Sequence, residues 1–161
     1  MVYTNEGRLL LTLCVVCQGE RVLLGMKKRG FGTGKWNGFG GKVHANEDPH
    51  AGAARELQEE AGIIPLGLTS SGVLHFDFLD GSSAPGELLE VHVFTVTQFR
   101  GTPSESEEMM PRWFAIPEIP YADMWPDDEH WLPQVVRGER VRCRFTFGTQ
   151  DTIVAHEVNL L

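Results

Sequence analysis

Three glutamates lie close together near the middle of the chain, in the segment R-E-L-Q-E-E that spans residues 55–60. If this segment is helical, Glu56, Glu59 and Glu60 share one face, because positions i, i+3 and i+4 are neighbours on a helix. Like charges at these spacings cost about 0.2–0.5 kcal/mol per pair. Local stability therefore does not explain the cluster, whereas a bound divalent cation does. Carboxylate oxygens are the ligands that Mg²⁺ and Mn²⁺ prefer.

The residues around the cluster predict a helix over 49–61. Asp48 suits the N-cap, Pro49 suits the first helical position, and Gly62 suits the left-handed position after the last turn. The glutamates then fall in the C-terminal half of the helix, where its dipole disfavours anions. A neighbouring face is apolar and predicts packing on a core, through Ala53, Ala54, Leu57 and Ala61. Taken alone, an E-x-x-E-E cluster is more often a solvated acidic face, so its context decides.

Alternation of apolar residues predicts a mostly β chain with a second, shorter helix. Strands are expected over residues 9–17, 21–27, 72–79, 88–98 and 111–116, and a closing hairpin over 140–147 and 152–158 around Gly148. The second helix is expected over 127–137, and residues 29–41 are expected to form a Gly-rich loop. This pattern is typical of an α+β fold around one core.

Composition narrows the class of protein. A chain of 161 residues is long enough for one domain with a real core. The net charge of −8 argues against a polynucleotide partner but not against free nucleotides, whose phosphates a metal can bridge. No apolar run approaches the roughly 18 residues of a membrane span, and the N-terminus lacks the basic start of a signal peptide. We therefore expect a cytoplasmic protein, with nuclear or mitochondrial fractions left open. Its three cysteines are expected to be free thiols, and its default state a monomer.

Residues 41–63 resemble the Nudix box, G-x5-E-x7-R-E-U-x-E-E-x-G-U, in which U is a bulky aliphatic residue. Every specified position matches, from Gly41 through Glu47 and the glutamate cluster to Gly62 and Ile63. The resemblance implies an α/β/α sandwich around a mixed β-sheet, with residues 1–161 as one domain. It also implies hydrolysis of a nucleoside diphosphate that is linked to another group.

The same resemblance implies roles for residues of the box. Glu56, Glu59 and Glu60 would hold the catalytic Mg²⁺, or Mn²⁺, together with the Gly40 carbonyl. Arg55 would orient the cluster with Glu47. A distant acid often completes the metal site in this family. Glu108 is our choice in the segment SESEEMM, where Glu105 and Glu107 are the alternatives.

Four further segments resemble the MutT-type branch of the family, which hydrolyses oxidised purine nucleoside triphosphates. They are LLGMKKRGFGTGKWNGFGGKV (23–43), EVHVF (90–94), GTPSESEEM (101–109) and MWPDD (124–128). The resemblance implies release of monophosphate and pyrophosphate from 8-oxo-dGTP, 2-hydroxy-dATP and, by extension, N6-methyl-dATP. The implied substrate-binding residues are Thr12, Lys27, Asn37, Phe39, Gly40, Gly41, Lys42, Phe76, Phe78, Trp125, Pro126, Asp127 and Asp128. Phe31, Met109 and Trp131 would complete an apolar wall.

Adjacent Asp127 and Asp128 suggest how a base could be recognised. If both are buried, they cannot both ionise cheaply, so the pKa of one carboxyl should rise. A protonated carboxyl donates a hydrogen bond and an ionised one accepts, so a pair sharing one proton could serve different oxidised bases. The bland alternative is that these acids simply begin a helix, where they suit its dipole.

Other activities stay open on sequence grounds. Within the family, the substrate could be a dinucleoside polyphosphate, ADP-ribose, NADH or an RNA cap. Outside catalysis, the chain could be a nucleotide-binding Nudix module, although the intact box argues against this. The sequence departs from the MutT-type pattern in a longer loop at residues 80–87, in Leu89 where a methionine is expected, and in the N-terminal segment 1–8. These departures bear on pocket shape and substrate ranking and leave the reaction class unchanged.

Overall fold

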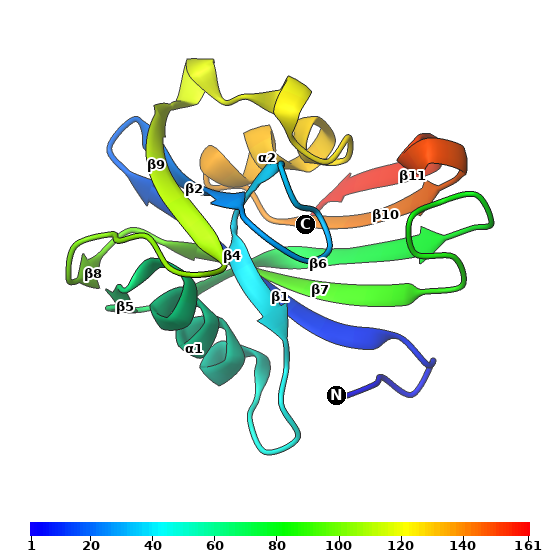
Figure 1. Cartoon of the computed structure of the whole chain (residues 1–161), viewed down its shortest axis with the longest axis horizontal. Coiled ribbons are helices and arrows are strands. Elements are labelled where there is room, and N and C mark those ends of the chain that lie inside the picture. The colour runs from blue at the N-terminus through cyan, green and yellow to red at the C-terminus, as the bar shows by residue number, and fades with distance from the viewer.

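The structure is a computed structural model that describes residues 1–161 (Figure 1). Its two α-helices are α1 (Pro49–Ala61) and α2 (Asp128–Val136). Three short 3₁₀ helices span Ile116–Glu118, Tyr121–Asp123 and Thr149–Asp151. The strands are β1 (Leu9–Gln18), β2 (Arg21–Lys27), β3 (Trp36–Asn37), β4 (Phe39–Lys42), β5 (Ile64–Pro65), β6 (Thr69–Phe78), β7 (Leu88–Val96), β8 (Phe99–Arg100), β9 (Met109–Ala115), β10 (Val141–Phe147) and β11 (Ile153–Leu160).

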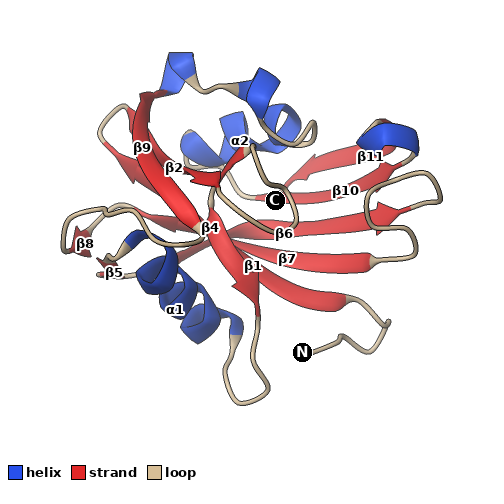
Figure 2. Ribbon diagram, viewed as in Figure 1, coloured by secondary structure: helices blue, strands red, loops and turns tan.

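Nine of the strands form one mixed sheet (Figure 2). Its order is β11-β10-β6-β7-β1-β2-β3, and β4 and β9 branch from it by pairing with β1 and β2. The pairs β1–β7 and β6–β10 are parallel, and the remaining pairs are antiparallel. The two outermost strands on one side, β10 and β11, come from the C-terminal hairpin that the sequence predicts.

Each face of the sheet carries its own core, because side chains alternate along a strand. On β1, Val15 belongs to the cluster that packs under α2, with Trp131 and Val135. Its neighbours Cys14 and Val16 belong to the opposite cluster, under α1. Figure 1 shows the two helices on different sides of the sheet. The α/β/α sandwich is therefore confirmed.

Helix α1 forms where its end signals and its apolar spacing agree. The Asp48 carboxylate accepts a hydrogen bond from the Ala51 N–H at 2.8 Å, and Pro49 occupies the first turn. Gly62 ends the helix in the left-handed region at φ 72°, which glycine adopts without strain. Ala53, Leu57 and Ala61 are fully buried against the sheet, as predicted.

The prediction of one loop over residues 29–41 is wrong in part, because this segment contains β3 and β4. Strand β4 lies along β1, with Gly40 opposite Leu13 and Gly41 opposite Thr12. The approach is so close that a Cβ on Gly40 would stand 1.8 Å from the Thr12 carbonyl oxygen. Such short strands carry too little periodicity to be read from sequence.

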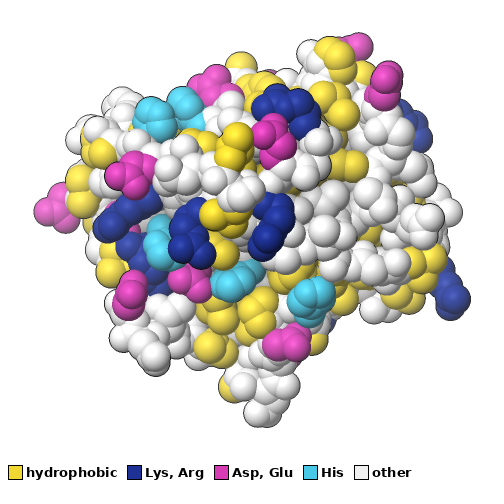
Figure 3. All heavy atoms as spheres, turned by 180° about the vertical axis from the view of Figure 1, so that it is seen from behind, with side chains coloured by type: hydrophobic (Ala, Val, Ile, Leu, Met, Phe, Trp, Pro, Cys, Tyr) yellow, Lys and Arg dark blue, Asp and Glu magenta, His cyan; other side chains and the backbone are white.

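Charges of both signs are interspersed with histidines on the back of the molecule (Figure 3). Asp77 on β6 is a buried carboxylate that anchors an ion-pair network: it is 8% exposed and meets Arg8 at 2.8 Å and Arg144 at 2.7 Å. Burial alone would raise the pKa of the Asp77 carboxyl, but hydrogen bonds from both arginines outweigh it and lower the pKa. No helix of the structure is long and apolar enough to cross a membrane.

We expect Asp77→Asn to lower the free energy of unfolding at pH 7 by about 2–4 kcal/mol, because it leaves the Arg8 guanidinium buried and unpaired. The folded-state pKa of Asp77 is depressed, so its contribution is present above the unfolded value of 3.8 and is lost as pH falls through the folded value. Urea unfolding of the variant and the wild type should therefore converge below about pH 3.8. The control is Arg144→Gln, which removes a partner that is 57% exposed and should cost under about 1 kcal/mol. An equal decrease in the free energy of unfolding for both variants would contradict this account.

Candidate active site

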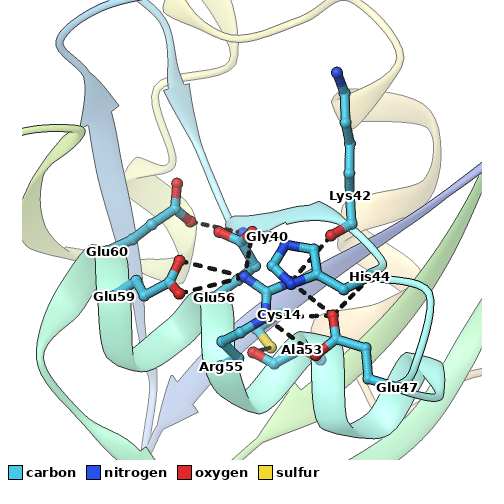
Figure 4. Close-up of polar contacts among 10 residues, drawn as sticks. All are labelled: Cys14, Gly40, Lys42, His44, Glu47, Ala53, Arg55, Glu56, Glu59 and Glu60. Carbon is cyan, nitrogen blue, oxygen red and sulfur yellow. Dashed lines mark hydrogen bonds and ion pairs between the residues drawn. The ribbon is translucent and has the colours of Figure 1, made fainter. Parts of the chain in front are cut away.

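The glutamate cluster of α1 faces β4, and Glu60 is its buried member. The side chain of Glu60 is 4% exposed, and its Oε1 accepts a hydrogen bond from the Gly40 N–H at 2.8 Å (Figure 4). Burial, followed by the negative charge of Glu56, raises the pKa of Glu60 to about 8. A buried carboxylate beside a second one is a costly arrangement for the protein alone. The arrangement therefore fits a cation.

Strand β4 leaves room for this cation because it presents glycines to the helix. A Cβ on Gly41 would lie 2.5 Å from Oε1 of Glu56, so any other residue at this position would push the carboxylate away. Backbone and carboxylate oxygens can thus approach one another without an intervening side chain. Oxygen-only ligands of this kind suit a hard divalent ion.

Arg55 is the centre that holds the acidic residues in place. Its guanidinium donates to Glu47 at 2.7 Å, to Glu56 at 3.0 Å, to Glu59 at 3.3 Å and to the Lys42 carbonyl at 3.0 Å (Figure 4). The hydrogen bonds from Arg55 are the largest cause that lowers the pKa of Glu47 to about 2. The sequence-based pairing of Arg55 with Glu47 is thus present in the structure. Arg55 does not itself line the cavity, so it acts on the site through its partners.

Besides Glu56, which pairs with Arg55, two further predicted metal ligands have basic partners in this structure. Glu59 is 57% exposed and lies on Arg55, and Glu108 pairs with Arg29 at 2.8 Å and with Lys27 at 3.6 Å. No three histidine, cysteine or acidic side chains converge on one point. The negative charges of Glu56 and, to a smaller extent, of Glu108 both contribute to the raised pKa of Glu60.

A cavity of about 320 Å³ opens beside Glu60, between the sheet, the Gly-rich segment and the start of α2. Most of the predicted substrate-binding residues line it, together with the predicted apolar wall. They are Thr12, Lys27, Asn37, Gly40, Gly41, Lys42, Phe76, Phe78, Trp125, Asp127 and Asp128, with Phe31, Met109 and Trp131.

Phe39 and Pro126 do not line the cavity, contrary to the sequence-based expectation. Phe39 is fully buried in the opposite core, under α1, so it supports β4 from behind. Sequence reasoning also missed lining residues on the sheet floor, chiefly Leu11, Leu13, Leu74, Val91 and Phe147. Successive side chains of a strand point to opposite faces of the sheet, so their positions along the strands could have placed these residues on the same face as Phe76 and Phe78.

The aspartate pair lies at the inner end of the cavity, and both side chains are 3% exposed. Asp127 accepts a hydrogen bond from the Trp131 Nε1–H at 2.8 Å, whereas Oδ2 of Asp128 has no partner. Burial, reinforced by the charge of Asp127, raises the pKa of Asp128 well above its usual range. Burial also raises the pKa of Asp127, although the hydrogen bond from Trp131 opposes that rise. Both directions agree with the rise that the sequence predicts for a buried pair. The Thr12 hydroxyl also lacks a partner, so the cavity presents unused polar atoms to a ligand.

Comparison with known proteins decides the family. The NUDIX domain model matches residues 8–135. The chain belongs to the Nudix family. It is 49% identical over 149 residues to the oxidized purine nucleoside triphosphate hydrolase of Mus musculus, covering 92% of this chain and 93% of that protein. The protein of the same name from Danio rerio is 47% identical over 150 residues, covering 93% and 94%.

Solved Nudix structures share the fold of this chain. The mutator MutT protein from Bacillus halodurans superposes with a TM-score of 0.83 at 23% identity, covering 94% of this chain and 97% of that one. The MutT Nudix hydrolase from Burkholderia pseudomallei gives a TM-score of 0.62 at 28% identity, covering 70% and 87%. Nudix hydrolases generally need a divalent metal, usually Mg²⁺, which agrees with the oxygen-rich surroundings of Glu60.

Proposed function

We propose that this Nudix protein hydrolyses oxidised purine nucleoside triphosphates to monophosphate and pyrophosphate. One observation carries the proposal. A single cavity is lined both by the buried Asp127–Asp128 pair, where α2 begins, and by Glu60 of α1 and Gly40 of β4. A purine that contacts the aspartates would therefore extend its phosphates toward the glutamates. The names of the mouse and zebrafish relatives support the same substrate class.

The inner end of the cavity supplies the chemistry for a modified purine. Trp125 offers a flat face for stacking and Asn37 offers an amide that both donates and accepts. A protonated Asp128 donates and an ionised Asp127 accepts, so the pair can read the altered edge of an oxidised base. The apolar wall excludes water from these contacts, which strengthens them.

The outer end supplies charge for the phosphates. Lys27 and Lys42 line the cavity and can neutralise phosphate oxygens. We assign the metal to Glu56, Glu60 and the Gly40 carbonyl, with Glu59 and Glu108 as further ligands after they leave their arginine partners. Bound Mg²⁺ would supply charge neutralisation and lower the pKa of the attacking water. Arg55 keeps Glu56 oriented, and Glu60 holds β4 through the Gly40 N–H.

We also propose that the whole chain works as one domain. Residues after the matched segment 8–135 form β10 and β11, which pair within the same sheet. Phe147 of β10 lines the cavity, so the C-terminal hairpin contributes to the base end.

The test is product analysis with Mg²⁺ on 8-oxo-dGTP, 2-hydroxy-dATP, N6-methyl-dATP and plain dGTP. We expect monophosphate and pyrophosphate, with kcat/KM at least about tenfold higher on an oxidised purine than on dGTP, because the unmodified base leaves the aspartate pair mismatched. Comparable rates on plain dGTP would refute the proposed specificity. Absence of turnover on every triphosphate would refute the substrate class, and dinucleotides would be assayed next.

A further inference from the structure

Residues 27–35 form a hairpin loop that touches both ends of the cavity. Its base is closed by two main-chain hydrogen bonds, from the Lys27 N–H to the Lys35 carbonyl at 3.1 Å and from the Gly34 N–H to the Lys27 carbonyl at 2.9 Å. At its tip, Gly30 and Gly32 have φ of 80° and 85°, which place Phe31 between two left-handed residues. Glycines therefore set the shape of the tip, and main-chain hydrogen bonds hold the loop at its base.

The tip of this loop covers the base end of the cavity by resting on Trp125. The Phe31 ring stacks on the Trp125 ring at 5.0 Å between centroids, with 30° between planes. The Lys35 ammonium lies 5.3 Å from the centroid of the same indole. Gly32 passes so close that a Cβ there would come 3.2 Å from the Trp125 Nε1. Phe31 is itself 53% exposed, so it is the outer wall of the cavity.

The other side of the loop is pinned to the segment 105–108 by a row of ion pairs, which we call the clasp. Lys28 meets Glu105 at 2.5 Å and also donates to the Ser106 carbonyl at 2.9 Å. Arg29 meets Glu108 at 2.8 Å and Glu107 at 3.3 Å. The Lys28 N–H donates to the Glu108 carbonyl at 2.8 Å, so main chain and side chains act together.

Ser106 fixes the segment 105–108 to α1, close to Glu60. The Ser106 hydroxyl donates to the Glu60 carbonyl at 2.9 Å and accepts from the N–H groups of Glu108 and Met109 at 3.3 and 3.1 Å. Segment 105–108 therefore keeps its place against α1 whatever the Glu108 side chain does. Only that carboxylate has to turn for Glu108 to change partners.

We propose that Arg29 is a positioning residue that competes with the metal for Glu108 and thereby couples metal occupancy to the loop that covers the base. The inference rests on the proposed function, in which Glu108 is a metal ligand. Before the metal is bound, Glu108 is neutralised by Arg29 and Lys27, and the loop is clasped over Trp125. Transfer of Glu108 to the metal frees Lys27 to meet the phosphates and loosens the loop on its outer side.

The test is Arg29→Gln, followed by two titrations without turnover. Mn²⁺ alone is titrated by electron paramagnetic resonance, and 8-oxo-dGMP is titrated by calorimetry in EDTA. We expect Mn²⁺ to bind roughly threefold to fivefold more tightly, because Glu108 loses an exposed competitor of modest strength. We expect 8-oxo-dGMP to bind roughly threefold more weakly, because a smaller fraction of molecules holds the loop closed. Damage to the fold would instead weaken the binding of both Mn²⁺ and 8-oxo-dGMP.

Lys28→Gln is the matched control, because it removes the same charge from the same loop without freeing Glu108. An equal gain in Mn²⁺ affinity for both variants would show long-range electrostatics and overturn the proposal. Unchanged Mn²⁺ affinity in Arg29→Gln would overturn it as well. Should Arg29→Gln fail to fold, Arg29→Lys serves instead, with the same signs at smaller size, since lysine keeps the charge but loses the fork. Wild-type turnover of 8-oxo-dGTP, measured in parallel, tests the proposed function separately, because the Mn²⁺ titration needs no nucleotide.

Discussion

Glu60→Gln is expected to lower kcat on the best oxidised purine triphosphate by about 10²–10⁴-fold while the protein stays folded. Glu60 is the buried carboxylate between α1 and β4, so no neighbouring side chain can easily take its place as a ligand. Glutamine has the same size, and its Oε1 can still accept the hydrogen bond from the Gly40 N–H. The change therefore removes one charge from the metal side of the cavity and little else.

The measurement combines single-turnover kinetics with thermal unfolding in EDTA. We expect the melting temperature of Glu60→Gln at pH 7 to equal or exceed that of the wild type. Burial raises the pKa of Glu60 to about 8, so the wild type must take up a proton or bury a charge on folding, whereas glutamine is neutral. Glu118→Gln is the control at an exposed site on the first 3₁₀ helix, and both its kcat and its melting temperature should match the wild type. A decrease in kcat of less than tenfold in Glu60→Gln would show that the catalytic centre does not depend on Glu60.

The elements that place Glu60 are largely predictable from sequence, because several local signals agree. For α1, the cap at Asp48, the left-handed glycine at position 62 and the spacing of buried apolar residues all indicate the same bounds. The long strands are predictable because each is an apolar-rich run of seven or more residues, and in β10 buried residues alternate with more exposed ones.

The parts that resist prediction depend on contacts between distant segments. Strand β4 forms because Gly40 and Gly41 can lie close against β1. A local run of glycines and aromatic residues does not predict that pairing. The side of Phe39 follows from the same register, because a shift of one residue would move it from the α1 core to the cavity. The partners of Glu108 are likewise invisible locally, since Arg29 is far from it in sequence.

Asp127 and Asp128 are expected to govern which base is hydrolysed, and their Asn variants should alter substrate preference more than chemistry. Asp127 accepts a hydrogen bond from Trp131, and burial raises the pKa of Asp128 well above its usual range. In our proposal Asp127 is therefore the ionised partner and Asp128 holds the proton. Asparagine at 128 still offers a donor, so we expect a shift of at least about tenfold in the ratio of kcat/KM for 8-oxo-dGTP and 2-hydroxy-dATP. Asparagine at 127 weakens the acceptor for both a base and Trp131, so its loss should be larger on every base.

The decisive measurement is kcat/KM for both substrates across a range of Mg²⁺ concentrations. The Mg²⁺ dependence should stay within about twofold of the wild type, because the pair lies at the start of α2 whereas Glu60 lies on α1. Asp123→Asn, at an exposed position on the second 3₁₀ helix, controls for the loss of one nearby charge. Equal losses on both substrates in both variants would mean that the pair only supports the fold of α2. A change in their ratio ties recognition to the proton that the two carboxyls share, because only the donor and acceptor pattern has changed.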